Sequence, residues 1–138
     1  MIKLYLDIDG VLLTAKHTRA AEGVDKFVDF VTTHFECYWL TTHCKGESIT
    51  ALKYIAQFMQ PKTIKRLEDA VRPANWDALK TEAIDFESDF YWLDDSPLPV
   101  ERRILEGNGV SDRLVLIDLE RPSELANIEL ELKYLLEP

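Results

Sequence analysis

Apolar runs that stop abruptly at polar side chains are the feature that most constrains the fold of this 138-residue chain. The first run, Ile2–Leu6, ends at Asp7, and similar short runs recur with helical stretches between them. The strands that we expect are Ile2–Leu6, Cys37–Leu40, Thr63–Leu67, Phe90–Leu93 and Leu114–Ile117. Strands that alternate with helices predict a parallel sheet covered on both faces. We therefore expect an α/β fold, a three-layer Rossmann-like arrangement around a five-stranded parallel sheet.

Helical periodicity fills the intervals between the expected strands. Val24, Phe27 and Val31, for example, fall on one face of a helix. The helical stretches that we expect are Ala20–Phe35, Ile49–Met59 (ended by Pro61), Asn75–Phe86, Val100–Glu106 and Ser123–Leu136. No repeat, low-complexity tract or linker rich in Gly, Pro or Ser interrupts them. Residues 1–138 are therefore expected to form a single domain.

The amino-acid composition limits which binding partners and which cellular compartment we expect for this protein. With 16 basic and 25 acidic residues, the net charge is −9, which argues against a broad basic face for nucleic acid or anionic lipid but leaves room for a small metal-assisted phosphate site. Cys37 and Cys44 are the only cysteines and form no zinc motif, as suits a reducing cytosol. No apolar run approaches the ~20 residues of a membrane span. We expect a cytoplasmic protein with no membrane partner.

Polar side chains follow three of the expected strands at the point where each strand ends. They are Asp7 and Asp9 after the first strand, Thr41 and Thr42 after the second, and Asp94 and Asp95 after the fourth. Ligands of open parallel sheets bind beyond the carboxyl ends of the strands. Carboxylates gathered there repel one another unless a cation neutralises them, and oxygen ligands suit a hard ion such as Mg²⁺. The pattern predicts a Mg²⁺ site at this edge of the sheet.

These residue types also suit phosphoryl transfer. Beside a bound metal, an aspartate such as Asp7 can attack phosphorus and form an aspartyl phosphate. Asp9, two residues later, projects from the turn and could protonate the leaving oxygen and then deprotonate the attacking water. A threonine hydroxyl and Lys80, which precedes the fourth strand, could hold the phosphoryl oxygens as charge redistributes.

Four segments of the chain resemble, in order, the four motifs of the haloacid dehalogenase superfamily of phosphatases. The segments are Asp7-Ile8-Asp9-Gly10-Val11-Leu12, Tyr38-Trp39-Leu40-Thr41, Lys80 and Trp92-Leu93-Asp94-Asp95-Ser96. Together they span most of the chain. The first is the most specific because it directly follows an N-terminal apolar strand, whereas Lys80 is assigned mainly by its position. The resemblance implies a phosphohydrolase whose cofactor is Mg²⁺.

The resemblance also implies a role for each matched residue. Asp7 would be the nucleophile and Asp9 the acid/base, while Thr41 and Lys80 would hold the phosphate together with the backbone N–H of Thr42. The metal ligands would be the Asp7 side chain, the Asp9 carbonyl, Asp95 and, directly or through water, Asp94.

A cap domain, which many members of that superfamily insert, has no room in this sequence. The chain looks like a capless member with an open site, most similar to the small domain of this type found in RNA-repair proteins. Capless members tend to act on large substrates that cover the site themselves. The phosphorylated substrate is therefore expected to be macromolecular or a nucleotide, contacted by loop residues such as Lys16 and Arg19. The negative net charge leaves a nucleic-acid partner undecided.

Several residue assignments stay open at this stage. Thr41 and Thr42 compete for the role of phosphate ligand. The rivals of Lys80 are Lys62, Lys65 and Arg72. The acids Asp94 and Asp95 could instead form a turn and helix cap. His43 is expected to line the rim without a catalytic role, and Asp118 is expected to lie outside the site.

Two other functions compete with a phosphatase. A catalytically weak module of the same fold could bind a phosphorylated partner without turnover, although such a module would be expected to lose Asp7 or Asp9. A response-regulator receiver also phosphorylates an aspartate on a parallel sheet. Its acceptor ends a middle strand, however, and the second strand here ends in Thr41.

Overall fold

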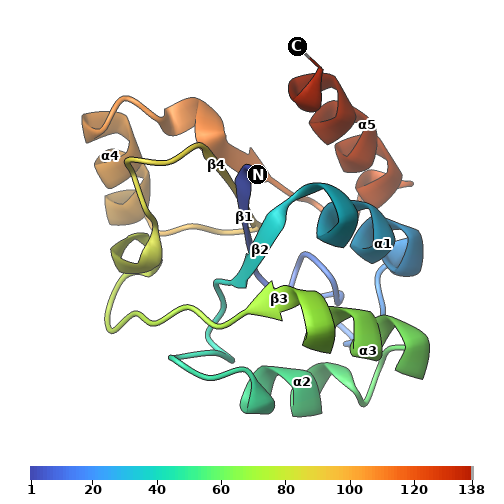
Figure 1. Ribbon diagram of the computed structural model, residues 1–138. Helices are drawn as coiled ribbons and strands as arrows, with labels where there is room; N and C mark the ends of the chain where they lie inside the picture. The colour runs from blue at the N-terminus through green and yellow to red at the C-terminus, as the bar shows by residue number, and fades with distance from the viewer. Residues whose placement is uncertain (138) are drawn as a thin grey trace.

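Every strand of the sheet runs parallel to its neighbours, in the order β3-β2-β1-β4-β5 (Figure 1). The structure is a computed structural model and describes residues 1–137. The strands are β1 (Lys3–Leu6), β2 (Glu36–Trp39), β3 (Val71–Arg72), β4 (Phe90–Asp94) and β5 (Leu114–Leu116). This arrangement confirms the expected Rossmann-like α/β fold. It also places β1 at the centre of the sheet, between β2 and β4.

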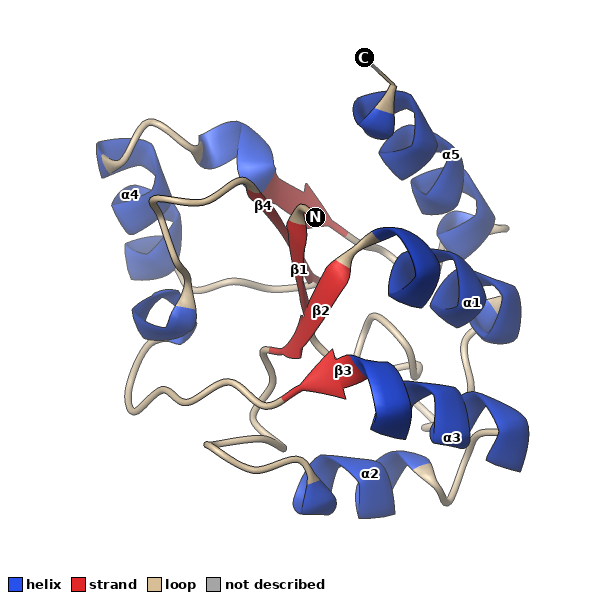
Figure 2. Cartoon of the chain, in the orientation of Figure 1, coloured by secondary structure: helices blue, strands red, loops and turns tan. Residues whose placement is uncertain are grey.

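Helices cover both faces of the sheet (Figure 2). They are α1 (Val24–His34), α2 (Ile49–Ile55), α3 (Pro61–Ala70), α4 (Pro99–Gly107) and α5 (Glu124–Leu136), with short 3₁₀ helices η1 (Lys80–Ala83) and η2 (Ser111–Arg113). α1 packs against α3 and α5 on one face, whereas α4 and η1 lie together on the other. Each face has its own apolar core: Leu4 and Trp39 belong to the first, and Phe90 and Trp92 to the second.

The expected strand Thr63–Leu67 is wrong, because these residues lie inside α3. Pro61 occupies the first turn of this helix, where backbone N–H groups have no partner within the helix, so proline loses no hydrogen bond there. The proline therefore begins a helix as well as separating it from α2. Thr63 and Leu67, four residues apart, are both buried on one face of α3. The third strand is instead the two-residue Val71–Arg72, directly after the helix.

The expected helix Asn75–Phe86 is also wrong over most of its length, since only Lys80–Ala83 is helical. The Glu82 carboxylate accepts the three successive backbone N–H groups of residues 77–79, at 2.7 to 3.1 Å. These hydrogen bonds hold the preceding backbone in a turn rather than a helix. Lys80 consequently stands at the start of η1, between that turn and β4.

The segments that follow β1 and β2 at the carboxyl ends of the strands leave no room for an additional folded unit. Residues 7–23 connect β1 to α1, and residues 40–70 between β2 and β3 contain α2 and α3. Within residues 1–137 no further folded unit is inserted at either place, as expected for a chain without a cap domain. None of the helices in this range has the length and apolar character to cross a membrane.

Candidate active site

Acidic residues meet where β1 and β4 end side by side. Leu6 pairs with Leu93 in parallel register, so Asp7 and Asp94 come next on neighbouring strands. The Asp7 backbone N–H donates to the Leu93 carbonyl at 3.2 Å. One carboxylate oxygen from each of Asp7, Asp94 and Asp95 lies within 4.8 Å of the others. We call these three residues the acidic cluster.

Lys80 brings a positive charge to the acidic cluster. Its ammonium donates to Asp94 Oδ2 at 2.7 Å and to Asp7 Oδ2 at 3.1 Å. The backbone of Lys80 is fixed by the buried Glu101, whose Oε2 accepts the Lys80 N–H at 2.7 Å. The other oxygen, Oε1, accepts the Leu98 N–H at the start of α4 at 2.8 Å. Glu101 thus ties η1 to α4 and holds Lys80 beside the strand ends.

The rival basic residues lie elsewhere in the fold. Lys65 pairs with Asp69 on the surface of α3 at 2.9 Å, and Arg72 pairs with Glu36 at 3.4 Å. Lys62 is exposed at the beginning of α3. Of the four candidates, the lysine of η1 is the one that contacts the acidic cluster within the described residues.

Burial and mutual repulsion change how the site titrates. Burial, followed by the charge of Asp94, raises the pKa of Asp7 to about 6, although the Lys80 ammonium opposes this in part. Burial and then Asp94 also raise the pKa of Asp95. Burial acts to lower the pKa of Lys80, but the charges of Asp7 and Asp94 outweigh it and raise that pKa. One ammonium does not balance three carboxylates, so a further cation would reduce the repulsion that remains among them.

The donor set fits Mg²⁺, which prefers carboxylate and carbonyl oxygens. Gly10 shows how closely the set is packed. Its φ is +83°, and a Cβ at this position would overlap the Asp95 carboxylate. A glycine is therefore required for the turn after β1 to lie against Asp95. The residues that could hold the ion are Asp7, Asp94 and Asp95 through their side chains and Asp9 through its carbonyl.

The Asp9 side chain is held apart from the acidic cluster. Its Oδ2 lies 2.8 Å from His43 Nε2, and its Oδ1 accepts the Tyr54 hydroxyl at 2.8 Å. The carboxylate is 40% exposed, whereas that of Asp7 is 10% exposed. Asp7 and Asp9 therefore have different surroundings: Asp7 is buried against Lys80, and Asp9 is partly exposed and contacts the polar atoms of His43 and Tyr54.

Sequence reasoning missed both partners of Asp9. His43 was expected to line the rim, and its contact with Asp9 was not predicted. The contact of Tyr54 with Asp9 was not predicted either. A histidine directly after the polar end of a strand is a weak signal for the first. Nothing in the sequence marks Tyr54, because it reaches Asp9 from α2 across 45 residues of chain.

The two threonines after β2 have different environments. The Leu40 N–H donates to the Leu6 carbonyl at 2.8 Å, so Thr41 follows at the end of β2 beside β1. Thr41 is fully buried, and its hydroxyl oxygen accepts the His43 N–H at 3.4 Å. Thr42 is exposed. Phosphate binding by either residue stays a prediction.

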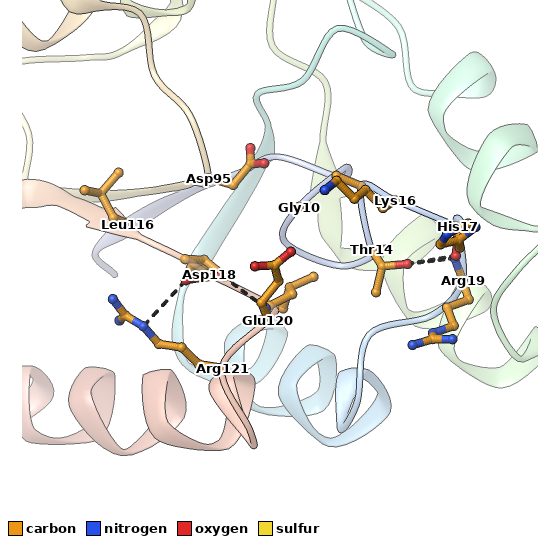
Figure 3. Close-up of a pocket in the computed structure, with 13 residues that line it drawn as sticks. Gly10, Thr14, Lys16, His17, Arg19, Asp95, Leu116, Asp118, Glu120 and Arg121 are labelled. Carbon is orange, nitrogen blue, oxygen red and sulfur yellow. Dashed lines mark hydrogen bonds and ion pairs between the residues drawn. The ribbon is translucent and has the colours of Figure 1, made fainter.

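A pocket of about 800 Å³ opens beside the acidic cluster (Figure 3). Gly10 and Asp95 line it together with residues 14–17, Arg19 and the segment 116–121, which begins at the end of β5. Asp118, which we expected outside the site, lines this pocket and pairs with Arg121 at 3.7 Å. Across the pocket lie the exposed Lys16, His17 and Arg19, here called the basic loop. Within residues 1–137, Lys16 and Arg19 make no ion pair.

Comparison with known proteins gives no match to a protein family, to a curated protein or to a solved structure.

Proposed function

We propose that this protein is a Mg²⁺-dependent phosphohydrolase of the haloacid dehalogenase type, which works through a phosphorylated Asp7. The observation that carries the proposal is the contact of Lys80 with both Asp7 and Asp94 at the acidic cluster. Phosphoryl transfer needs a nucleophile, ligands for a metal ion and a cation for the phosphoryl oxygens. These residue types meet at the carboxyl ends of β1 and β4, where a parallel sheet binds its ligands.

Mg²⁺ would be held by the carboxylates of Asp7, Asp94 and Asp95 and by the Asp9 carbonyl. When bound, the ion offsets the charge of the phosphoryl oxygens, which would otherwise repel an attacking carboxylate. The Lys80 ammonium adds a second positive charge from the neighbouring helix η1. Thr41 or the Thr42 backbone would contribute hydrogen bonds to the same oxygens.

The chemistry of the chain's own residues then follows in two steps. An Asp7 oxygen attacks phosphorus, the bond from phosphorus to the substrate oxygen breaks, and its electron pair goes to that oxygen. Asp9 donates a proton to the departing oxygen. Water next attacks the phosphorus of phosphorylated Asp7, Asp9 takes up a water proton, and the bond between Asp7 and phosphorus breaks. Inorganic phosphate leaves, and both aspartates return to their starting state.

The pocket beside Asp95 is the natural place for the group attached to the phosphoryl oxygen. It is open, and within residues 1–137 no cap lies over it. A small leaving group would be held there by few contacts, whereas a large one can exclude water with its own surface and supply binding energy from remote contacts. We therefore propose an end-phosphorylated macromolecule as the substrate, with the basic loop contacting its chain.

Hydrolysis of 4-nitrophenyl phosphate by the purified protein tests the reaction, with Mg²⁺ or with EDTA. We expect turnover that requires Mg²⁺ and falls about a thousandfold or more in Asp7→Asn, since the nucleophile is lost. Asp112→Asn is the matched control. The Asp112 side chain is 82% exposed and lies in η2, at the other end of the sheet, so this variant should be as active as the wild type.

Equal trace rates for the wild type and Asp7→Asn would refute an Asp7-dependent hydrolase. Phosphate binding without turnover, across aryl phosphates, nucleotides and phosphopeptides, would instead identify a module that recognises phosphorylated partners. The two outcomes separate because binding of inorganic phosphate can be measured by calorimetry without any reaction.

A further inference from the structure

Both carboxylate oxygens of Asp9 are engaged by side chains outside the four motifs. The Tyr54 hydroxyl donates to Oδ1 at 2.8 Å, and His43 Nε2 lies 2.8 Å from Oδ2. A tyrosine hydroxyl keeps its proton at neutral pH, so Tyr54 is the donor of this hydrogen bond. A carboxylate held at both oxygens has little freedom to rotate about its side-chain bonds.

The two partners also hold each other. The rings of His43 and Tyr54 are stacked, with centroids 4.0 Å apart and planes inclined by 15°. Phe58 packs edge-on against Tyr54 at 5.7 Å. The backbone of His43 is fixed in turn by the end of β2, because its N–H donates to the Thr41 hydroxyl oxygen. The His43–Tyr54 pair thus joins α2 to the loop after β2.

Asp9 needs such support because of its neighbours. Lys80 already contacts Asp7 and Asp94, and the acidic cluster repels another carboxylate. An unsupported Asp9 side chain, 40% exposed, would be free to turn into solvent. General acid catalysis requires the proton donor within hydrogen-bond reach of the oxygen that it protonates. A small displacement of a catalytic group can reduce the rate substantially.

We propose that His43 and Tyr54 are positioning residues, which hold the Asp9 carboxylate at the place where the leaving oxygen departs. This inference rests on the proposed phosphohydrolase function. In the first step the bond between phosphorus and the substrate oxygen breaks and that oxygen receives the Asp9 proton. The His43–Tyr54 pair acts through Asp9 alone and touches neither phosphorus nor the Asp7 oxygen that attacks it.

Two aryl phosphates that differ in leaving group test the proposal. Phenolate is a poor leaving group that needs a proton, whereas 2,4-dinitrophenolate departs without one. The parameter kcat/KM covers the steps up to transfer of the phosphoryl group to Asp7, so it isolates protonation of the leaving oxygen. Tyr54→Phe keeps the ring stack and removes only the hydroxyl. His43→Phe keeps an aromatic ring against Tyr54 and removes the nitrogen that contacts Asp9.

We expect each variant to lower kcat/KM for phenyl phosphate roughly tenfold and for 2,4-dinitrophenyl phosphate less than about twofold. The double variant and Asp9→Asn should show the same selectivity with a larger loss. Tyr134→Phe, which deletes a hydroxyl from a tyrosine 76% exposed on α5, is the matched control and should change neither value. A purely structural role would lower both values equally.

An equal loss on both substrates, or no loss on either, overturns the inference even if Asp7→Asn abolishes turnover. Absence of Asp7-dependent turnover in the wild type refutes the proposed function instead. Crystal structures supply a readout independent of activity. We expect Asp9 in a single rotamer on both partners in the wild type and in more than one rotamer in the double variant. A wild-type Asp9 turned away from His43 and Tyr54 also overturns the inference.

Discussion

The acidic cluster, through Asp95, and the basic loop border the same pocket but are built in opposite ways. In the cluster, Asp7 and Asp94 are buried and share the ammonium of Lys80. In the loop, Lys16 and Arg19 are exposed and make no ion pair within residues 1–137. The cluster residues depend on one another for their charge state, whereas no ion pair of the described residues depends on Lys16 or Arg19.

This difference suggests that the acidic cluster would serve the reaction itself and the basic loop the recognition of the substrate. A buried network fixes geometry and charge, and it suits the part of a reaction that is the same for every substrate. An exposed loop suits the part that varies, since recognition in such folds lies in loops. Substitutions in the cluster should therefore change both stability and chemistry, and substitutions in the loop should change only the choice of substrate.

The largest expected effect is the loss of Lys80. In Lys80→Met, two buried carboxylates lose their partner, so we expect the free energy of unfolding at pH 7 without metal to fall by about 3–4 kcal/mol. Turnover should fall about a hundredfold or more because the phosphoryl oxygens lose a cation. Urea unfolding and the aryl phosphate assay measure the two quantities.

Lys65→Met is the control for that substitution. Lys65 pairs with Glu68 and Asp69 on the surface of α3, and its loss should cost less than about 1 kcal/mol. If Lys80→Met were as stable as Lys65→Met, the buried ion pairs of Lys80 would contribute no more to stability than an exposed pair on α3.

The second-largest expected effect is a dependence of stability on pH, which arises from the titration of Asp7. Its folded-state pKa of about 6 lies above the ordinary value of 3.8, so the folded protein binds more protons than the unfolded chain between these values. The free energy of unfolding of the metal-free protein should therefore fall by about 3 kcal/mol from this group as pH rises from well below 3.8 to well above 6, and most of the fall lies between these values. Asp7→Asn should lack this fall.

Addition of Mg²⁺ gives a second way to test the raised pKa of Asp7. Mg²⁺ binds the ionised carboxylates, so it should raise the melting temperature more at pH 7 than at pH 5. An identical pH profile in the wild type and Asp7→Asn would contradict the raised pKa of Asp7. Lys16→Ala serves as the control here, since it should leave the profile unchanged.

The smallest effect belongs to the basic loop. In the double variant Lys16→Ala and Arg19→Ala, we expect stability to change by less than about 0.5 kcal/mol. The kcat/KM for a 5′-phosphorylated oligonucleotide should fall roughly fivefold at low salt, and that for a mononucleotide less than about twofold. Lys62→Ala, on α3, is the matched control. Equal efficiency of the wild type on the two substrates would exclude a macromolecular substrate and point to a small phosphate ester.

The parts of the structure that the sequence predicts well are those decided by local pattern. The apolar runs before Asp7 and Asp94 indicated strands, and parallel pairing then placed these acids side by side. The helix α3 is not predicted, because a short segment that contains Lys65 and Arg66 resembles an edge strand. Pro61 can begin a helix as well as end one, and the local pattern does not distinguish the two.

The parts that the sequence does not reveal depend on contacts between distant residues. The turn before Lys80 is set by the carboxylate of Glu82, whose hydrogen bonds compete with helix formation. The contact of Tyr54 with Asp9 depends on how α2 lies beside the strand ends. Periodicity describes which face of a helix is apolar, and it carries no information about which polar residue that helix will meet.

The order of the strands determines when the site can form during synthesis of the chain. β1 is made first yet lies in the middle of the sheet, and its second neighbour, β4, begins only at Phe90. Until β4 is made, one edge of β1 has no partner strand, and Asp7 has no neighbouring Asp94. Pairings between distant parts of a chain form slowly because a long loop must close first. Assembly of the acidic cluster is thus a late event, and a nascent chain that pauses before β4 exposes a strand edge prone to association with other chains.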